Sequence, residues 1–231
     1  MSEPKEHQSL MATLFVQNSA ESYTNSLSIY KAAEDQLEKV VENTQVSAAI
    51  EQTEGFSGKP PAVILDVDQT VLDNIAYQAR LIETNTYYPQ GWKEWCEEEQ
   101  ADYMPGVESF LNKASELGIE VFFITNRDVN VEQATKNNLE KLGFKFTKNL
   151  DQLLMKNEEP NWGSNKNSRR SLLNTATSSI KRSVTEKEIE KEKGGTTCAL
   201  PRLYELTYWI WIKIFYCCVC YFLFEFVWLQ S

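Results

Sequence analysis

Hydrophobic residues in the N-terminal part of the chain recur every three or four positions from about Leu10 to Val46. This spacing is typical of helices that bury one face. Ser19 precedes Glu21 at a position where its hydroxyl could cap the start of a helix. We therefore predict a helical arm that packs against a domain. Its packed face is expected to contain Tyr23, Leu27, Tyr30, Leu37, Val40 and Val41.

Between residues 62 and 156 the pattern changes to short apolar runs that alternate with amphipathic stretches. This alternation is typical of an α/β fold with a doubly wound parallel sheet, in which ligands sit at the carboxyl ends of the strands. Asp66 and Thr125 both fall at such ends. The predicted strands are 62–65, 119–125 and 150–156, and the predicted helices are 105–118 and 131–143.

Beyond about Leu173 the alternation stops. Residues 174–198 are polar and charged, and residues 206–229 are aromatic, apolar and rich in cysteine. The pattern gives no sign of a further strand in this tail, and without one an edge of the first strand would lack a partner. The predicted organisation is an N-terminal helical arm over 1–57, an α/β core over 58–173 with a small lid insertion at about 75–104, and a divergent tail over 174–231.

Charge and composition narrow the function. Residues 1–160 carry 27 acidic and 13 basic side chains, and residues 161–231 carry 6 and 10, for a net charge of −10. The acidic first part argues against nucleic acid as the main partner, because phosphate backbones require basic surfaces. His7 is the only histidine, which argues against histidine-based triads, and we expect it to be solvated. The N-terminus has no secretory signal pattern, and the five cysteines form neither a zinc pattern nor a disulfide framework.

The stretch DVDQTVLDN at 66–74 contains two aspartates directly after a buried strand. The Asp66 carboxylate could attack phosphorus, and Asp68 could serve as general acid and then base. Two carboxylates repel a phosphate ester, so this chemistry requires a cation such as Mg²⁺. The competing interpretation, an EF-hand calcium loop, fails because Val71 and Tyr77 stand where Gly and Glu are needed. A phosphate site therefore explains the pattern better.

Three segments together resemble a known family, the haloacid dehalogenase-like phosphatases. They are DVDQTVLDN at 66–74, the stretch from WKEW to FFITNRD at 92–128, and EPNWGSNKNSRR at 159–170. The chain is most similar to the class C (subfamily IIIB) nonspecific acid phosphatases, the bacterial lipoprotein-e type that is also described as 5′-nucleotidases. The resemblance covers about residues 8–173.

This resemblance implies an Mg²⁺-dependent acid phosphatase that acts on small phosphate monoesters or nucleotides. Carried over to this sequence, Asp66 is the nucleophile and a metal ligand, and Asp68 is the general acid/base whose backbone carbonyl also contacts the metal. The resemblance assigns phosphate binding to Thr125, Asn126 and Lys166. The family is typically exported to the periplasm or outer membrane and lipid-anchored. Among the lid aromatics we select Trp92 as a candidate to stack on the substrate, with plain packing as the alternative.

The sequence departs from the family pattern at three points. Gln69 and Asn165 stand where the family usually has acids. The family's last motif, an acidic pair that completes the metal site, has no counterpart, because no aspartate follows Asp151. The chain could therefore be a truncated or frame-altered, inactive relative. For the tail, three hypotheses remain: an altered reading frame, a membrane anchor over 206–229 interrupted by Lys213 and Glu225, or a divergent pair of core strands.

Overall fold

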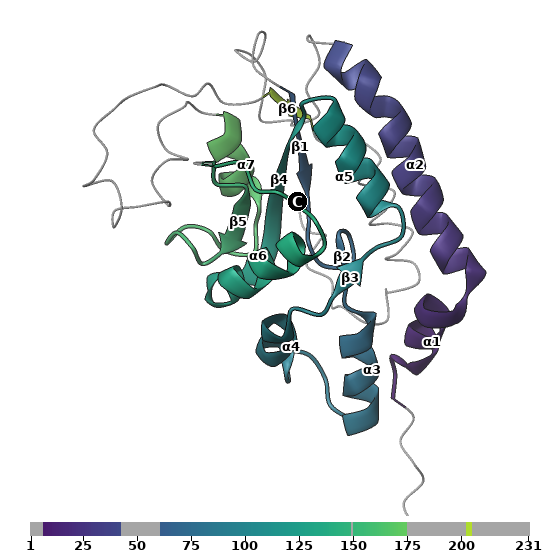
Figure 1. Cartoon of the computed structure of the whole chain (residues 1–231). Coiled ribbons are helices and arrows are strands. Elements are labelled where there is room, and N and C mark those ends of the chain that lie inside the picture. The colour runs from purple at the N-terminus through teal and green to yellow at the C-terminus, as the bar shows by residue number, and fades with distance from the viewer. Residues whose placement is uncertain (1–6, 43–60, 149, 175–201, 205–231) are drawn as a thin grey trace, which may run out of the picture.

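The computed structural model describes residues 7–42, 61–148, 150–174 and 202–204. A four-stranded parallel sheet forms the centre of the molecule, with the strand order β5-β4-β1-β6 (Figure 1). Its strands are β1 (Pro61–Leu65), β4 (Glu120–Asp128), β5 (Leu153–Lys156) and β6 (Arg202–Tyr204). The three strands predicted from apolar runs are thus confirmed, and β4 extends beyond its predicted end through the polar residues that follow Thr125.

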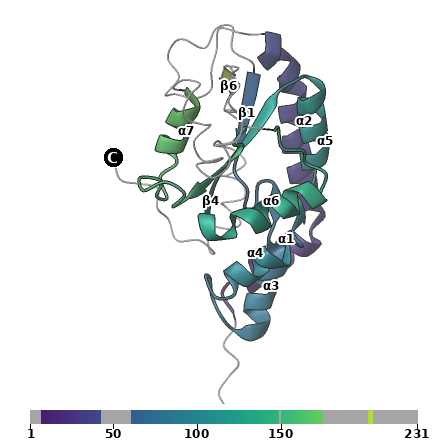
Figure 2. The same ribbon diagram turned by 60° about the vertical axis from the view of Figure 1, so that its left-hand side comes forward.

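Helices cover both faces of this sheet, as Figures 1 and 2 show from two directions. Alternate residues of β1 point to opposite faces, so Val63 and Leu65 belong to one core cluster, and Ala62 and Ile64 to another. The first cluster includes side chains of α2, α5 and α6, and the second includes Leu173 of α7. The helices are α5 (Val107–Glu116), α6 (Glu132–Lys141, after the 3-10 turn Val129–Val131) and α7 (Asn167–Asn174). The predicted doubly wound α/β fold is confirmed.

The sequence pattern gave no sign of a strand in the tail, but Arg202–Tyr204 supplies one. This segment forms β6 and pairs in parallel with β1, with Pro61 opposite Arg202 and Val63 opposite Tyr204. The second edge of β1 is therefore occupied over three residues. The apolar–polar pattern could not reveal β6, because such a short strand is held by backbone pairing with its neighbour. The other residues of 174–231, including 206–229, lie outside the described structure apart from Asn174.

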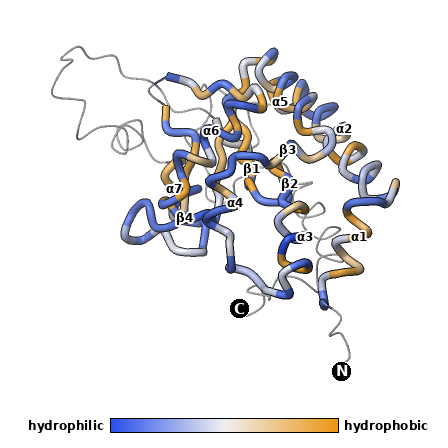
Figure 3. Tube along the Cα trace, turned by 60° about the horizontal axis from the view of Figure 1, so that its bottom comes forward, coloured by the Kyte–Doolittle hydropathy of each residue, from blue (hydrophilic) through white to orange (hydrophobic). Residues whose placement is uncertain are grey.

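The N-terminal arm consists of α1 (Leu10–Asn18) and α2 (Ala20–Glu42), which meet at Ser19. The predicted cap is confirmed, since Ser19 Oγ accepts a hydrogen bond from the Ser22 amide at 3.0 Å. The predicted packed face is only partly correct. Tyr30 and Leu37 are buried, whereas Tyr23 and Leu27 are exposed. Figure 3 colours α1 and α2 by hydropathy and shows hydrophobic (orange) and hydrophilic (blue) stretches along both helices. The buried face of α2 consists of Ser22, Ser26, Tyr30, Ala33 and Leu37.

Small polar side chains explain this difference, because they let α2 approach α5 closely. Ser26 Oγ donates to the Pro105 carbonyl at 2.8 Å. The Tyr30 hydroxyl donates to the Thr70 carbonyl at 2.6 Å, which ties the arm to the turn after β1. A hydrophobicity pattern counts serine as polar and so places it on the solvent face. The arm is thus attached by hydrogen bonds as well as by apolar packing.

A lid-like unit lies between β1 and α5 in chain order and below the sheet in Figure 1. It contains α3 (Ile75–Thr84), α4 (Trp92–Glu98) and the small antiparallel pair β2 (Leu72–Asp73) and β3 (Asp102–Tyr103). His7 packs on this unit, which corrects the expectation of a solvated side chain. The His7 ring stacks on Tyr87 at 4.6 Å, and its Nε2 lies 2.8 Å from the Thr86 carbonyl.

Among the helices that the structure describes, none has the length and apolar character needed to cross a membrane. The proposed anchor over 206–229 falls outside these residues and stays a prediction.

Candidate active site

Asp66 is the residue directly after β1, at the carboxyl edge of the sheet. Its Oδ2 forms an ion pair with Lys166 Nζ at 2.7 Å, and its Oδ1 accepts the Val67 amide hydrogen at 2.8 Å. The side chains of Asp66 and Lys166 are only 14% and 17% exposed. Lys166 comes from the loop before α7, so the fold brings together two predicted site residues that are far apart in sequence.

The turn after Asp66 leads the chain from β1 into the lid. The Val67 carbonyl accepts the amide hydrogens of Val71 and Leu72, both at 2.9 Å. Gln69 adopts a positive φ of 50° and its side chain accepts the Asn74 amide hydrogen at 2.5 Å. The same side chain donates to Asp73 at 3.2 Å. Gln69 therefore stabilises the turn, and the amide can do this because it both donates and accepts hydrogen bonds.

Asp68 lies in this turn with its carboxylate 32% exposed. Its Oδ1 accepts hydrogen bonds from Arg127 Nε at 2.8 Å and from Asn74 Nδ2 at 2.9 Å. The Arg127 side chain is only 1% exposed. Asp68 is thus held by two neighbours and still accessible to solvent, as a group that transfers protons to a substrate must be.

The two predicted phosphate-binding residues in the carboxyl-terminal half of β4 differ in exposure. Thr125 is fully buried, and its Oγ1 accepts the Arg127 amide hydrogen at 3.0 Å. Asn126 is exposed, and its Oδ1 accepts a hydrogen bond from Arg169 Nη2 at 2.8 Å. The structure places both residues at the same sheet edge as Asp66, as parallel strand ends require.

Arg169 of α7 connects the β4 end with the Lys166 loop. Its buried guanidinium donates to the Thr125 carbonyl, and to the Gly163 carbonyl at 2.9 Å. Burial lowers the pKa of Arg169, and the neighbouring Asp66 carboxylate opposes that shift. The sequence interpretation missed both Arg127 and Arg169. Each lies inside a segment that carried the family resemblance, but the partners of a buried arginine depend on the tertiary structure.

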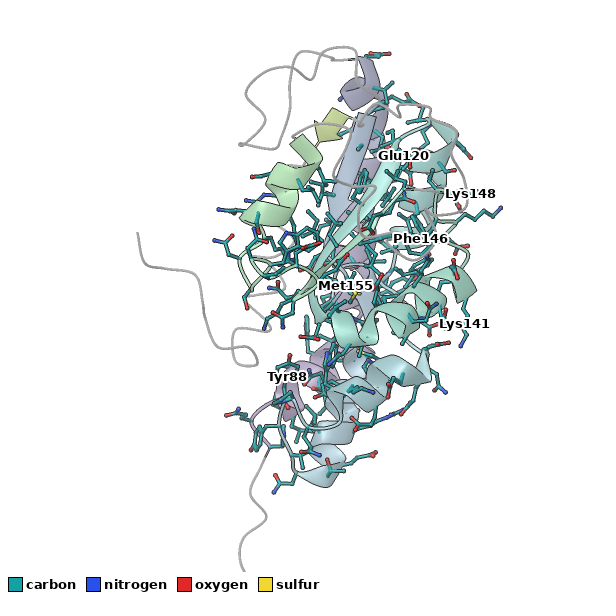
Figure 4. All side chains as sticks on the ribbon, turned by 90° about the vertical axis from the view of Figure 1, so that its left-hand side faces the viewer. Tyr88, Glu120, Lys141, Phe146, Lys148 and Met155 are labelled. Atoms are coloured by element: carbon teal, nitrogen blue, oxygen red, sulfur yellow. The ribbon has the colours of Figure 1, made fainter. Side chains whose placement is uncertain are left out.

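Three aromatic side chains of the lid contact one another, and Tyr88 among them lies near Asp68. Trp92 is partly buried, with edge-to-face contacts to Tyr77 at 5.0 Å and Tyr88 at 5.8 Å. The guanidinium carbon of Arg127 lies 5.3 Å from the centre of the Trp92 ring. Tyr88 is 52% exposed, and Figure 4 shows it at the lid end, below Met155 of β5. Partial burial, followed by the nearby Asp68 carboxylate, raises the pKa of Tyr88. Trp92 therefore packs within the lid, and Tyr88 is the more accessible ring. Stacking of Trp92 on a substrate stays a prediction.

A family model for the HAD superfamily, subfamily IIIB (acid phosphatase), matches residues 3–184. The chain belongs to this family. The match extends beyond the expected boundary near residue 173 and leaves residues 185–231 outside it.

Solved structures agree with this membership of HAD subfamily IIIB. The chain is 31% identical to a class C acid phosphatase from Bacillus anthracis with tungstate bound, with a TM-score of 0.61 over 73% of this chain. A second structure of the class C acid phosphatase from Bacillus anthracis gives 30% identity and a TM-score of 0.62, again over 73% of this chain. The chain covers 65% and 64% of those two chains, just under two thirds of their length.

Carboxylate and carbonyl oxygens are the atoms that bind a hard divalent cation. The residues that the structure describes supply only part of the ligands that such a cation needs. No group of three or more His, Cys, Asp or Glu side chains that could hold a metal ion occurs in the described ranges. The donors that the family resemblance predicts are the Asp66 carboxylate and the Asp68 carbonyl. Mg²⁺ commonly uses one or two carboxylates together with water and substrate phosphate, so these donors fit it.

Proposed function

We propose that the chain is an acid phosphatase that hydrolyses small phosphate monoesters through an aspartyl-phosphate intermediate on Asp66. The observation that carries this proposal is the Asp66–Lys166 pair at the end of β1, with Asp68 two residues further on. Membership of HAD subfamily IIIB supports the same conclusion. A carboxylate beside an ammonium group and a second carboxylate provide a nucleophile, an anion-binding charge and a proton carrier.

In the first step an Asp66 carboxylate oxygen attacks phosphorus, and the ester P–O bond breaks. Asp68 gives its proton to the departing alcohol oxygen. In the second step Asp68 takes a proton from water, which attacks phosphorus and breaks the bond to Asp66, so that phosphate leaves. Lys166, with the Thr125 hydroxyl and the Asn126 side chain, binds the phosphoryl oxygens. In this scheme Lys166 exchanges its Asp66 partner for the substrate phosphate.

Mg²⁺ is the proposed cofactor, held by the Asp66 carboxylate and the Asp68 backbone carbonyl. When bound, the ion offsets the negative charge of the phosphate and the two aspartates. The tungstate-bound relative supports an oxyanion site, because tungstate is a tetrahedral oxyanion like phosphate. For the leaving group we propose a nucleoside or another aromatic group that contacts Trp92 and the exposed Tyr88 ring.

A second candidate is an inactive relative that retains the nucleophile turn. This alternative is motivated by the missing acidic motif and by the family match that ends at residue 184. The loss of one carboxylate that coordinates the metal should weaken metal binding, because hard cations depend on anionic oxygen ligands. The two candidates differ in whether the purified chain turns over substrate.

The deciding experiment measures hydrolysis of p-nitrophenyl phosphate by the full chain between pH 4 and 8, with and without added Mg²⁺. We expect turnover that requires the metal. The Asp66→Asn variant should lose activity by about 10⁴-fold or more, because removing a nucleophile commonly leaves only background rates. Asp66→Asn keeps the size of the side chain and its hydrogen bond from Val67, so the variant should remain folded. Absence of turnover by a folded wild-type chain would establish the inactive relative.

A further inference from the structure

Arg127 joins the predicted acid/base residue, Asp68, to the lid, and each of its three guanidinium nitrogens donates a hydrogen bond. Its Nε donates to Asp68 Oδ1 at 2.8 Å, and its Nη2 donates to Asn74 Oδ1 at 3.2 Å. Its Nη1 donates to Thr135 Oγ1 of α6 at 3.1 Å. Trp92 of the lid lies on the guanidinium at 5.3 Å. This arrangement buries a charge that a structural role alone would not require, because burying a guanidinium is costly.

We propose that Arg127 is a positioning residue, which sets the orientation of the Asp68 carboxylate for proton transfer and couples that orientation to the lid. This inference rests on the proposed phosphatase function. Arg127 does not touch the reacting atoms in this scheme; it acts through Asp68.

The geometry at Asp68 explains how this positioning works. Arg127 Nε and Asn74 Nδ2 both donate to Oδ1 of Asp68, so two bonds converge on one oxygen. The carboxylate plane is thereby fixed, and we assign the proton transfer to the other oxygen, Oδ2. A guanidinium provides this control because its donors are rigid and planar, whereas a lysine ammonium rotates freely and makes a single directed contact.

The lid controls both side chains that hold Asp68. The Trp92 ring covers the Arg127 guanidinium, and Trp95 Nε1 donates to Asn74 Oδ1 at 2.9 Å. Trp95 is buried and Asn74 is 3% exposed, so this second contact is shielded from water. Both tryptophans belong to α4. A displacement of α4 would therefore alter both supports of Asp68 together.

The test compares two substrates that need general-acid help to different degrees. p-Nitrophenyl phosphate has a leaving group that departs readily, whereas glycerol phosphate has an alkoxide leaving group that must be protonated. The parameter kcat/KM reports the steps up to phosphoryl transfer. In Arg127→Ala we expect kcat/KM to fall about 100-fold for glycerol phosphate and about 10-fold for p-nitrophenyl phosphate. Arg127→Lys should recover only part of this loss.

A second readout isolates the step in which Asp68 acts as a base. If Arg127→Ala slows hydrolysis of the aspartyl-phosphate more than its formation from p-nitrophenyl phosphate, a rapid burst of nitrophenolate should precede steady turnover. The burst should approach one equivalent per enzyme. Trp95→Phe removes the indole N–H together with the five-membered ring that carries it, and keeps an aromatic side chain at this buried position. It should change the substrate ratio in the same direction by about 3-fold, as expected for one lost hydrogen bond.

Arg80→Gln is the matched control. Arg80 also lies over a lid tryptophan, 5.0 Å from the centre of the Trp95 ring, but it pairs with Glu98 at the surface. We expect its substrate ratio to equal that of the wild type. Equal losses on both substrates without a burst, in a folded Arg127→Lys or Trp95→Phe variant, would overturn the positioning role. A folded wild type inactive on both substrates would instead overturn the proposed function, and the positioning role with it.

Discussion

Lys166 and Asp66 provide a direct test of the site at the level of single side chains. Lys166→Met removes the charge proposed to bind phosphate and leaves the partly buried Asp66 carboxylate without this cation. We expect kcat/KM for p-nitrophenyl phosphate to fall about 100-fold, since a charged hydrogen bond contributes about 1.5–3 kcal/mol. Inorganic phosphate should also inhibit the variant more weakly, which a competition assay measures.

Lys141→Met serves as the control for this substitution. Lys141, the last residue of α6, pairs with Glu99 at the end of α4 and has a 59% exposed side chain. Its variant should retain wild-type kinetics. Equal phosphate inhibition of Lys166→Met and wild type would contradict a phosphate-binding role for Lys166.

The sequence located Asp66 and Asp68 correctly at a strand end, because a buried run followed by acids has few other uses in a parallel sheet. It could not identify Arg127 or Arg169, whose partners lie up to 59 residues away along the chain. It also placed His7 wrongly in solvent. A lone polar side chain in a polar segment carries no sign of the ring or carbonyl that it will meet, so burial of this kind follows only from the fold.

The packing of α2 against α5 is the element contact that mutation can test most sharply. Gly106 has a φ of +94°, and a Cβ added there would lie 2.7 Å from the Tyr30 Cβ. Gly106→Ala therefore combines an unfavourable backbone conformation with a steric clash. We expect the free energy of unfolding to decrease by about 2–4 kcal/mol. Thermal denaturation of the purified chain should show a Tm lower by about 2–4 °C for each kcal/mol lost.

Gly118→Ala separates these two contributions. Gly118 has a φ of +67°, but a Cβ added there would meet nothing within 4 Å. It should cost only the conformational penalty, about 1 kcal/mol. If the two variants lose the same stability, α2 does not approach α5 as closely as the structure indicates.

Elements with a strong pattern were predicted best. The strands β1, β4 and β5 and the helices α5 and α6 follow their apolar periodicity closely. The buried face of α2 was misassigned because two of its contact positions are serines. β6 was missed because three residues paired through their backbone carry no periodic signal.

At the level of the whole molecule, an acidic pocket of about 250 Å³ lies at the β5 side of the sheet. Glu132, Asp151, Glu158 and Glu159 line it, together with Lys136. Burial, and then the Asp151 carboxylate, raises the pKa of Glu158 from its ordinary value of 4.5 to about 8. The folded chain thus holds a proton at Glu158 over a pH range in which the unfolded chain has released it.

The sign of the pH effect follows directly. Below about pH 4.5 Glu158 is protonated in both states, so the stabilisation due to its raised pKa is fully present. This stabilisation decreases as the pH rises above about 4.5 and is lost as the pH passes about 8, because Glu158 ionises in the unfolded chain at a lower pH than in the folded chain. Glu158→Gln cannot ionise and keeps an oxygen that can accept the hydrogen bond from the Met155 amide, whose nitrogen lies 2.9 Å from Glu158 Oε2. The variant should therefore match the wild type at pH 4.5 and exceed its Tm by roughly 3 °C at pH 8.5.

Thermal scans of the wild type, Glu158→Gln and Glu159→Gln from pH 4.5 to 8.5 measure this difference. Glu159 lines the same pocket but is exposed, so its variant corrects for the removal of one negative charge from the surface. The Tm of Glu158→Gln relative to that of Glu159→Gln should rise with pH, because the raised pKa of Glu158 keeps it protonated in the folded wild type where the unfolded chain has released the proton. A difference that stays constant with pH would show that Glu158 ionises at its ordinary pKa. The acidic pocket would then impose no penalty on stability at neutral pH.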